Sequence, residues 1–371
     1  MCSYQQFLDN ALGKGVITLK KDEKTLITQI FDNNQEYLEL KKNFFRRINR
    51  LVGLYSGTSN FSDLKNKIEL IARKNNWKGA YAELAAYDIL NNCDCLAKSV
   101  KMECVINLEE SLAKDFGKKD ANIDGYVEEF DLYFDVKIMA DVVNDFLENV
   151  IKHAKETAGC IGSCSVLPEY NLEDDESVYA EKYNDLTNEL TSFLKSKKSR
   201  ADSMVLDGLS YNIKYGSGVN MSENTYSPYE HAYKHGEMLL KRYSYKFLKN
   251  KPFYLVMVNF PWYNPLLNCD DNEIFYRSLA RRHFCDIMQN SKKMIDLCPK
   301  FSGKGTVRDV ARKLAGIIFL EDLSIKEQSY NCYVYLNPNA DNKNPLAEDY
   351  LNAIVHQAKK GRFDNFFFDN Y

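Results

Sequence analysis

The chain has 371 residues, of which 45% are hydrophobic and 27% charged, and its formal net charge is −3. These values exclude a disordered chain and a general attraction to polyanions, so any nucleic-acid contact must use local basic patches. The first thirty residues contain no apolar signal core, and ten cysteines without a secretory signal predict reduced thiols. The longest apolar runs are too short to span a bilayer. We therefore expect a cytoplasmic protein that makes no membrane contact.

The N-terminal region, residues 1–75, shows a helical pattern. Apolar residues recur at steps of three and four along "TLITQIFDNNQEYLELKKNFFRRINRLVGLY". The next stretch, "WKGAYAELAAYDILNN", is rich in Ala and Leu and predicts a well-buried helix over 78–91. This helix opens the first part of the expected core, which we assign to residues 76–140.

A strand and a hairpin complete that first part. The strand is predicted in "KSVKMECVINLEE" and the hairpin in "NIDGYVEEFDLYFDVKIM", residues 122–139. A turn at 128–131 sets Val127 opposite Leu132 and, further along, Asp124 opposite Asp135. One face of the hairpin is then apolar, whereas the other collects two aspartates, two tyrosines and Lys137.

The opposed aspartates have two interpretations. Directly opposed residues have Cβ atoms about 4.5–5.5 Å apart, and two like charges at that separation need compensation. A divalent metal ion between the carboxylates would supply it, and oxygen ligands favour Mg²⁺ or Mn²⁺ over zinc. The alternative is a solvated polar face with a cross-strand Asp–Lys pair, which stabilises by only a few tenths of a kcal/mol.

The second half of the chain resumes the α/β pattern after an interruption. Residues 141–227 are strongly charged and predict a mostly helical insertion. A helix over 229–248 then leads into "KPFYLVMVNF", whose continuous apolar character is typical of a strand buried on both faces. We assign 228–330 to the second part of the core and 331–371 to a C-terminal strand and tail.

The order of these elements resembles that of the PD-(D/E)xK phosphodiesterases, the restriction-endonuclease-like nucleases. The matching residues are Glu83 in "GAYAELAAYDIL", Asp124 in "NIDGY", and Asp135 and Lys137 in "FDVKI". The resemblance covers about 76–140 and 228–262. It departs from the name-giving motif at Ile123, which replaces the proline before the first aspartate.

The resemblance implies an α/β fold with a restriction-endonuclease-like central mixed sheet flanked by helices. It also implies that Glu83, Asp124, Asp135 and the carbonyl of Val136 hold Mg²⁺ or Mn²⁺. Lys137 would orient the attacking water and stabilise charge on the scissile phosphate. This agrees with the chemistry, because phosphodiester hydrolysis needs a cation to activate water and to neutralise developing charge.

The activity that follows is a metal-dependent DNA endonuclease in restriction or anti-phage defence. A catalytically idle member of the fold that binds nucleic acid or a protein partner is the alternative, as is an RNA-cleaving enzyme. Nucleic acid is the expected partner, with a homodimer or a defence-system protein as further partners. The residues assigned to nucleic-acid binding are Arg281, Arg282 and Lys234. The residues assigned to auxiliary roles are His231 and His235, although solvated or core-edge histidines are the alternative.

Overall fold

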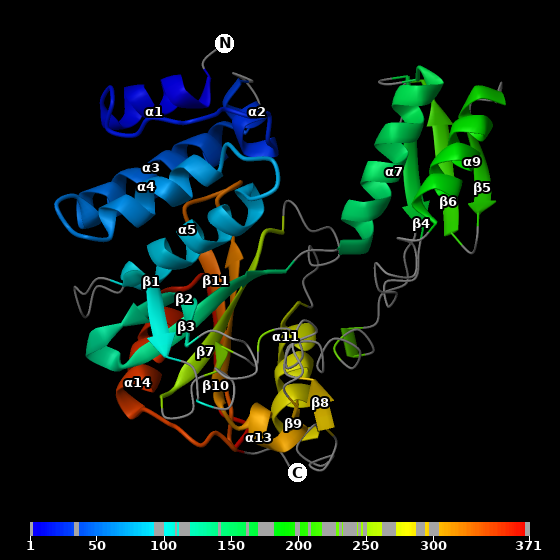
Figure 1. Cartoon of the computed structure of the whole chain (residues 1–371). Coiled ribbons are helices and arrows are strands. Elements are labelled where there is room, and N and C mark those ends of the chain that lie inside the picture. Colours follow the sequence, from blue (N-terminus) through cyan, green and yellow to red (C-terminus); the bar gives the residue numbers. More distant parts are fainter. Residues whose placement is uncertain are drawn as a thin grey trace. The chain divides into compact units, whose positions relative to one another are not determined.

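The computed structural model describes most of the chain (Figure 1). The described residues are 3–32, 37–92, 100–107, 110, 119–139, 142–160, 163–169, 182–196, 201–206, 209–216, 228–229, 232, 243, 246–247, 251–261, 272–286, 294–296 and 304–367. The chain divides into two compact units. The first combines Met1–Met139 with His235–Tyr371, and the second is Ala140–Lys234. Each unit is described by itself.

The first unit begins with five helices. They are α1 (Tyr4–Leu12), α2 (Leu26–Asp32), α3 (Leu38–Tyr55), α4 (Phe61–Leu70) and α5 (Trp77–Asn91). Most residues of α5 are buried, as its small and apolar composition requires. The predicted N-terminal helical region and the predicted buried helix over 78–91 are therefore confirmed.

The core of the first unit is a seven-stranded mixed sheet. Its strands are β1 (Lys101–Asn107), β2 (Asp120–Val127), β3 (Leu132–Ile138), β7 (Phe253–Asn259), β10 (Leu314–Asp322), β11 (Tyr330–Leu336) and β12 (Lys360–Asp364). They lie in the order β1-β2-β3-β7-β10-β11-β12. Strand β7 pairs in parallel with both β3 and β10. The predicted α/β class with a mixed sheet is thus confirmed, and the sheet resumes with β7 as expected.

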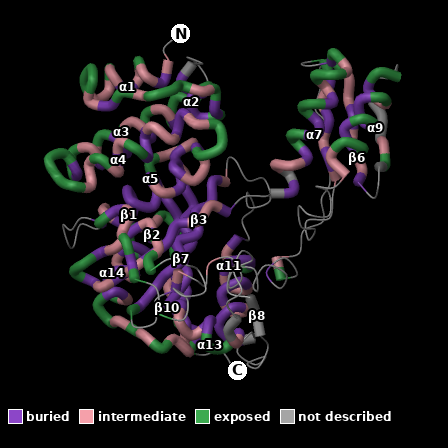
Figure 2. Tube along the Cα trace, in the orientation of Figure 1, coloured by how far each residue is buried: buried purple, intermediate pink, exposed green. Residues whose placement is uncertain are grey.

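Helices cover both faces of this sheet. On one face, α5 and α14 (Pro345–Gln357) share a hydrophobic core with side chains such as Val136, Val256 and Val334. On the other face lies α11 (Asn272–Arg281), where Tyr276 stacks on Phe319 of β10. Every residue of β7, β10 and β11 is buried (Figure 2), which explains their unbroken apolar runs. The helix α13 (Val307–Ala311) leads directly into β10.

The second unit, Ala140–Lys234, contains a sheet that we did not expect. Helices α7 (Val142–Ala158) and α9 (Tyr183–Ser196) accompany three antiparallel strands. These strands are β4 (Cys164–Glu169), β5 (Ala201–Leu206) and β6 (Leu209–Tyr215), in the order β4-β6-β5. The two helices agree with the predicted helical character of this segment, whereas the three-stranded sheet was not part of the prediction. Strand β4 was missed because it is short and contains Pro168, which is tolerated only at the edge position that β4 occupies.

The C-terminal prediction also needs correction. Residues 331–371 were expected to form a strand and a tail, but they hold most of β11, all of α14 and β12, and thus complete the main sheet. Asn344 caps the N-terminus of α14, with Pro345 at its first position. Among the helices that the structure describes, none has both the length and the apolar character needed to cross a bilayer.

Candidate functional site

The hairpin of β2 and β3 carries the predicted site. Its turn is the short 3-10 helix Glu128–Phe130, closed by Asp131 with a left-handed φ of 46°, a conformation that Asp tolerates. The paired residues are Val127 with Leu132, Tyr126 with Tyr133, and Gly125 with Phe134. The turn and the pairing proposed from sequence up to this point are confirmed.

Beyond Gly125 the two strands relate differently. Strand β3 continues beside β7, with Asp135 opposite Leu255. Asp124 no longer pairs through its backbone with β3; instead its Oδ2 accepts the backbone N–H of Val136 at 2.7 Å. The predicted backbone pairing of Asp124 with Asp135 is thus replaced by a side-chain contact. This contact fixes the carboxylate of Asp124 against β3.

The ammonium group of Lys137 lies close to the carboxylates of both Asp124 and Asp135. Its ammonium forms an ion pair with Asp135 and lies 3.7 Å from Oδ2 of Asp124. The other oxygen of Asp135 is held by Lys246, with Nζ to Oδ1 at 2.8 Å. Asp135 is fully buried, and burial alone would raise the pKa of its carboxyl. Lys137 and Lys246 together hold that pKa below its ordinary value, so Asp135 is ionised.

Glu83 meets Asp124 from the helix α5. One carboxylate oxygen each from Glu83, Glu103 and Asp124 lie within 4.8 Å of one another, a separation suited to a shared cation. Asp135 is not a member of this group among the described residues; its two oxygens pair instead with Lys137 and Lys246. The structure therefore brings together the predicted Glu83 and Asp124, and it adds Glu103.

The charges of this group are unfavourable without a cation. Burial, followed by the repulsion of Asp135, raises the pKa of Asp124 to about 7. Burial also raises the pKa of Glu83, and its negative charge is only partly offset by Lys67. The ammonium of Lys137, by contrast, stays protonated, since Asp135 and Asp124 outweigh the effect of its burial on the pKa. A divalent cation would relieve the repulsion between the acids.

Glu103 enters the group through a distortion of β1. Strands β1 and β2 pair at Met102 with Gly125 and at Cys104 with Ile123, which leaves Glu103 opposite Asp124. Glu103 has a φ of 50°, a conformation uncommon for residues other than glycine. Such local strain occurs preferentially at functional sites.

A buried lysine joins the two glutamates. Lys67 of α4 forms ion pairs with both Glu83 and Glu103, and only 9% of its side chain is exposed. Burial disfavours its charge, but the two glutamates hold the pKa of Lys67 above its ordinary value. Lys67 thereby links two helices, α4 and α5, to the strand β1 at one edge of the site.

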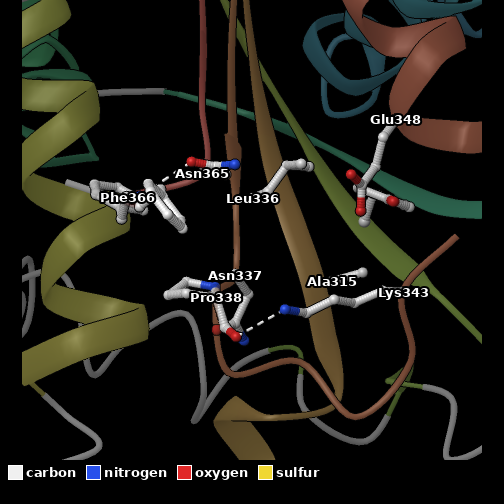
Figure 3. A pocket seen from close by; sticks show the side chains of 10 residues that line it. Ala315, Leu336, Asn337, Pro338, Lys343, Glu348, Asn365 and Phe366 are labelled. Carbon is white, nitrogen blue, oxygen red and sulfur yellow. Dashed lines mark hydrogen bonds between the residues drawn. The ribbon is translucent and has the colours of Figure 1, made fainter. Parts of the chain in front are cut away.

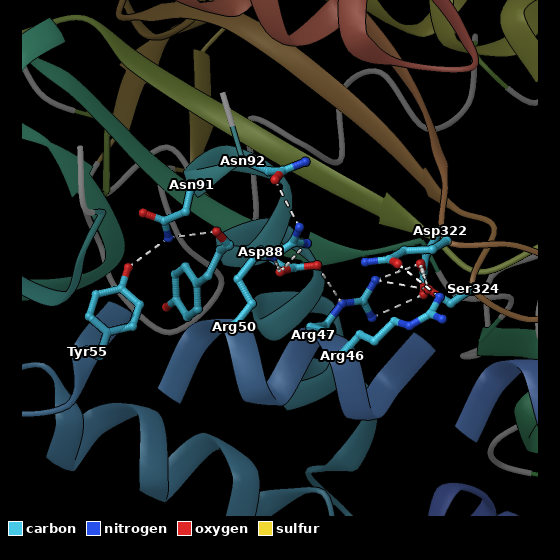
Figure 4. A network of polar contacts seen from close by, with 11 residues as sticks. Arg46, Arg47, Arg50, Tyr55, Asp88, Asn91, Asn92, Asp322 and Ser324 are labelled. Atoms are coloured by element: carbon cyan, nitrogen blue, oxygen red, sulfur yellow. Dashed lines mark hydrogen bonds and ion pairs between the residues drawn. The ribbon is translucent and has the colours of Figure 1, made fainter. Parts of the chain in front are cut away.

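A second polar network fixes α5 in place (Figure 4). Arg47 of α3 lies between Asp88 of α5, with Nε to Oδ2 at 3.3 Å, and Asp322 of β10, with Nη2 to Oδ1 at 2.8 Å. Tyr81 of α5 donates to the same Asp322 at 2.7 Å. All four side chains are buried. Because Glu83 lies between Tyr81 and Asp88 in sequence, this network also fixes the direction from which Glu83 reaches Asp124.

The backbone of Asp124 is held as well. The hydroxyl of Tyr87, one turn beyond Glu83 on α5, donates to the Asp124 carbonyl at 2.7 Å. The next residue, Gly125, lies under the ring of Phe134 so closely that a Cβ would clash with it. Helix α5 thus positions the site through a carboxylate and a hydroxyl on one face.

The remaining predicted residues are placed as follows. The Val136 carbonyl, predicted as a metal ligand, accepts a hydrogen bond from Lys137 Nζ at 2.9 Å. Arg281 ends α11 and Arg282 begins the π-helical turn Arg282–Asp286; both are half-buried. Lys234, His231 and His235 lie outside the described residues.

The structure also contains a pocket of about 290 Å³ near the C-terminal segment (Figure 3). Lys343 and Glu348 lie on one side of it and Asn365 and Phe366 on the other. Glu83, Glu103, Asp124 and Asp135 are not among the residues that line this pocket.

Comparison with models of known protein families finds no match. Comparisons with curated proteins and with solved structures find no significant match either.

Three residues of the site escaped the sequence analysis: Glu103, Lys67 and Lys246. Glu103 reads as an ordinary outward residue of a strand, and Lys67 as part of an amphipathic helix. Lys246 is separated from Asp135 by 111 residues. An acid flanked by apolar residues in "KMECVIN" was the one local signal that could have indicated Glu103.

Proposed function

We propose that this protein is a metal-dependent nuclease of the PD-(D/E)xK type that hydrolyses phosphodiester bonds of DNA. The observation that carries the proposal is the convergence of Asp124, Asp135 and Lys137 beside Glu83. The acid–x–Lys element is on a central strand, the first aspartate is on the preceding hairpin strand, and the glutamate is on the helix before it.

The donor set suits Mg²⁺ or Mn²⁺. Glu83, Glu103 and Asp124 offer oxygen ligands at a suitable spacing, and hard divalent cations prefer such ligands. Burial and the negative charge of Asp135 raise the pKa of Asp124, and a bound cation would oppose both effects. These three residues would hold the metal, which when bound lowers the pKa of water and neutralises negative charge on the phosphate.

The protein's own residues would supply the rest. Lys137, held by Asp135 and by its own strand, presents a positive charge beside the acids and would bind the scissile phosphate as charge develops on it. Asp135 positions Lys137 and Lys246 through both of its oxygens. The half-buried Arg281 and Arg282, together with Lys234, are proposed to contact the backbone of the nucleic acid. Restriction or anti-phage defence is the setting we propose for this activity.

A cleavage assay tests the proposal. The purified protein is incubated with plasmid, single-stranded DNA and RNA, in Mg²⁺, Mn²⁺ or EDTA, and the products are resolved on gels. We expect DNA cleavage with either metal and none in EDTA. Cleavage of RNA alone would assign the protein to the RNA-cleaving alternative. Binding without cleavage of any substrate would favour the catalytically idle alternative.

A further inference from the structure

Within the site, positive and negative side chains nearly balance. Four carboxylates meet three ammonium groups, which leaves one net negative charge when all are ionised. The carboxylates are Glu83, Glu103, Asp124 and Asp135, and the ammonium groups are Lys67, Lys137 and Lys246. One divalent cation would make this site singly positive, which a singly charged phosphodiester neutralises. Two divalent cations would leave the site strongly positive, and the two ions would repel each other strongly in this buried setting.

The contacts of Lys67 account for this balance. Its ammonium pairs with Oε2 of Glu83 and with Oε1 of Glu103. On the other side of the group, Oδ2 of Asp124 receives the N–H of Val136. In the contacts of the described residues, each of these three carboxylates keeps one oxygen outside the ion pairs and the hydrogen bond. Three oxygens are a set for one cation, since Mg²⁺ keeps several of its waters.

We propose that Lys67 is a positioning residue that takes the place of a second metal ion, so that the site works with a single divalent cation. This inference rests on the proposed metal-dependent nuclease. Lys67 bridges two carboxylates from α5 and β1 as a second cation would, and it is itself buried. The ammonium is permanent, whereas a metal ion depends on concentration.

Metal stoichiometry tests the inference on the full chain. Mn²⁺ is titrated calorimetrically into the wild-type protein above about pH 7, and bound ions are counted as those lost in Asp124→Asn. We expect one ion in the wild type and two in Lys67→Met, where Glu83 and Glu103 lose their counter-charge. Lys67→Arg retains the charge and should again bind one ion.

Lys65→Met provides the matched control. Lys65 is on the same helix, and its Nζ lies over the ring of Phe61, 5.2 Å from the centroid. The substitution changes the net charge identically without touching the acids, so the count should stay at one. A second ion in Lys65→Met would show that overall charge sets the count, which would overturn the inference. Two ions in the wild type, or one ion bound with unchanged affinity in Lys67→Met, would overturn it equally.

Two further outcomes keep the test decisive. Circular dichroism shows whether Lys67→Met folds; if it does not, Lys67→Met/Glu103→Gln restores the net charge of the site. That double variant should bind one ion, and two ions would contradict the inference. A wild-type protein that cleaves DNA with two ions bound refutes only the role of Lys67. A wild-type protein that binds no Mn²⁺ and cleaves nothing refutes the proposed function itself.

Discussion

Glu103 lies opposite Asp124, between two residue pairs that join β1 and β2 in regular register. The left-handed φ of 50° at Glu103 interrupts the regular pairing at that point, and the two carboxylates offer oxygens within 4.8 Å of each other. A strand that placed an acid here for solubility alone would not need a strained backbone. The strain supports a role for Glu103 in holding a cation.

Replacing Glu103 tests that role. We expect Glu103→Gln to weaken Mn²⁺ binding by roughly 10- to 100-fold, the range found for residues that support a metal site. The amide keeps the size of the side chain but removes one negative charge from the group. Calorimetric titration measures the change. The exposed Glu128→Gln, at the turn of the same hairpin, serves as control, and an equal loss in both variants would refute the assignment.

Lys137→Ala should slow cleavage strongly while the protein remains folded. A positioned cation near the reacting phosphate contributes several kcal/mol, so we expect a fall in rate of about 10²- to 10³-fold. Mn²⁺ binding should persist or tighten, since the acids lose a compensating charge. Single-turnover cleavage and Mn²⁺ titration measure the two effects.

The control for this prediction is Lys101→Ala. Lys101 is an exposed lysine of β1 whose ion pair with Glu128 lies at the surface. That variant should cleave at the wild-type rate. A Lys137→Ala protein that cleaves as fast as the wild type would end the assignment of Lys137 to the chemistry.

Metal affinity should depend on pH through Asp124. The pKa of this carboxyl is raised from its ordinary 3.8 to about 7, so the folded chain retains a proton that the unfolded chain has lost. The metal-free protein should therefore lose stability as pH rises between these values. Metal binds the ionised form, so affinity should rise about tenfold per pH unit up to about 7 and then level off. Mn²⁺ titrations between about pH 5.5 and 8 measure this; a flat profile would contradict it.

Gly125→Ala should destabilise the hairpin at the site. A Cβ there would lie 2.2 Å from Cζ of the buried Phe134, so the ring must move within a packed core. Overpacking of this kind costs about 1–3 kcal/mol in free energy of unfolding, which urea denaturation measures. The matched control is Gly79→Ala in α5, where nothing lies within 4 Å of the added carbon. It should stabilise the helix by about 0.5–1 kcal/mol. Equal effects of the two substitutions would show that packing on Phe134 is unimportant.

Arg47→Met should strongly destabilise the first unit. The variant leaves Asp88 and Asp322 buried without the guanidinium that pairs with both. Removing one partner of a buried ion network costs about 3–5 kcal/mol, measurable by urea or thermal unfolding. Arg46→Met, one residue earlier and exposed, should change stability by less than about 1 kcal/mol. A small effect of Arg47→Met would show that the network does not anchor α5.

The sequence predicted the parts of this molecule whose signal is local. The hairpin with its turn, the buried helix α5 and the apolar strand β7 each have a composition or periodicity that a short window contains. The predicted neighbours Asp135 and Lys137 follow from that periodicity. Because both residues lie in one strand, the acid–x–Lys element could be predicted without any three-dimensional information.

The rest required contacts between distant segments. Lys246 pairs with Asp135 although it follows the whole second unit in the sequence, and Lys67 reaches Glu83 from a separate helix. Neither lysine differs in local pattern from a solvated one. The edge strand β4 was missed for a different reason, because six residues containing a proline give too weak an alternation to be distinguished from a loop.

The insertion of the second unit between β3 and β7 affects how the chain folds. Strand β3 ends at Ile138, and its hydrogen-bonded neighbour β7 begins at Phe253, about 115 residues later in the sequence. At the usual rate of synthesis of about 5–20 residues per second, roughly 6–23 s pass before β7 is made, and the edge of β3 stays unpaired during that time. An open edge is a template for pairing with other chains, and inward-pointing charges are a known protection against it. Asp135 and Lys137 belong to the strand with this unpaired edge. The charged residues assigned to catalysis would therefore also reduce aggregation of the nascent chain.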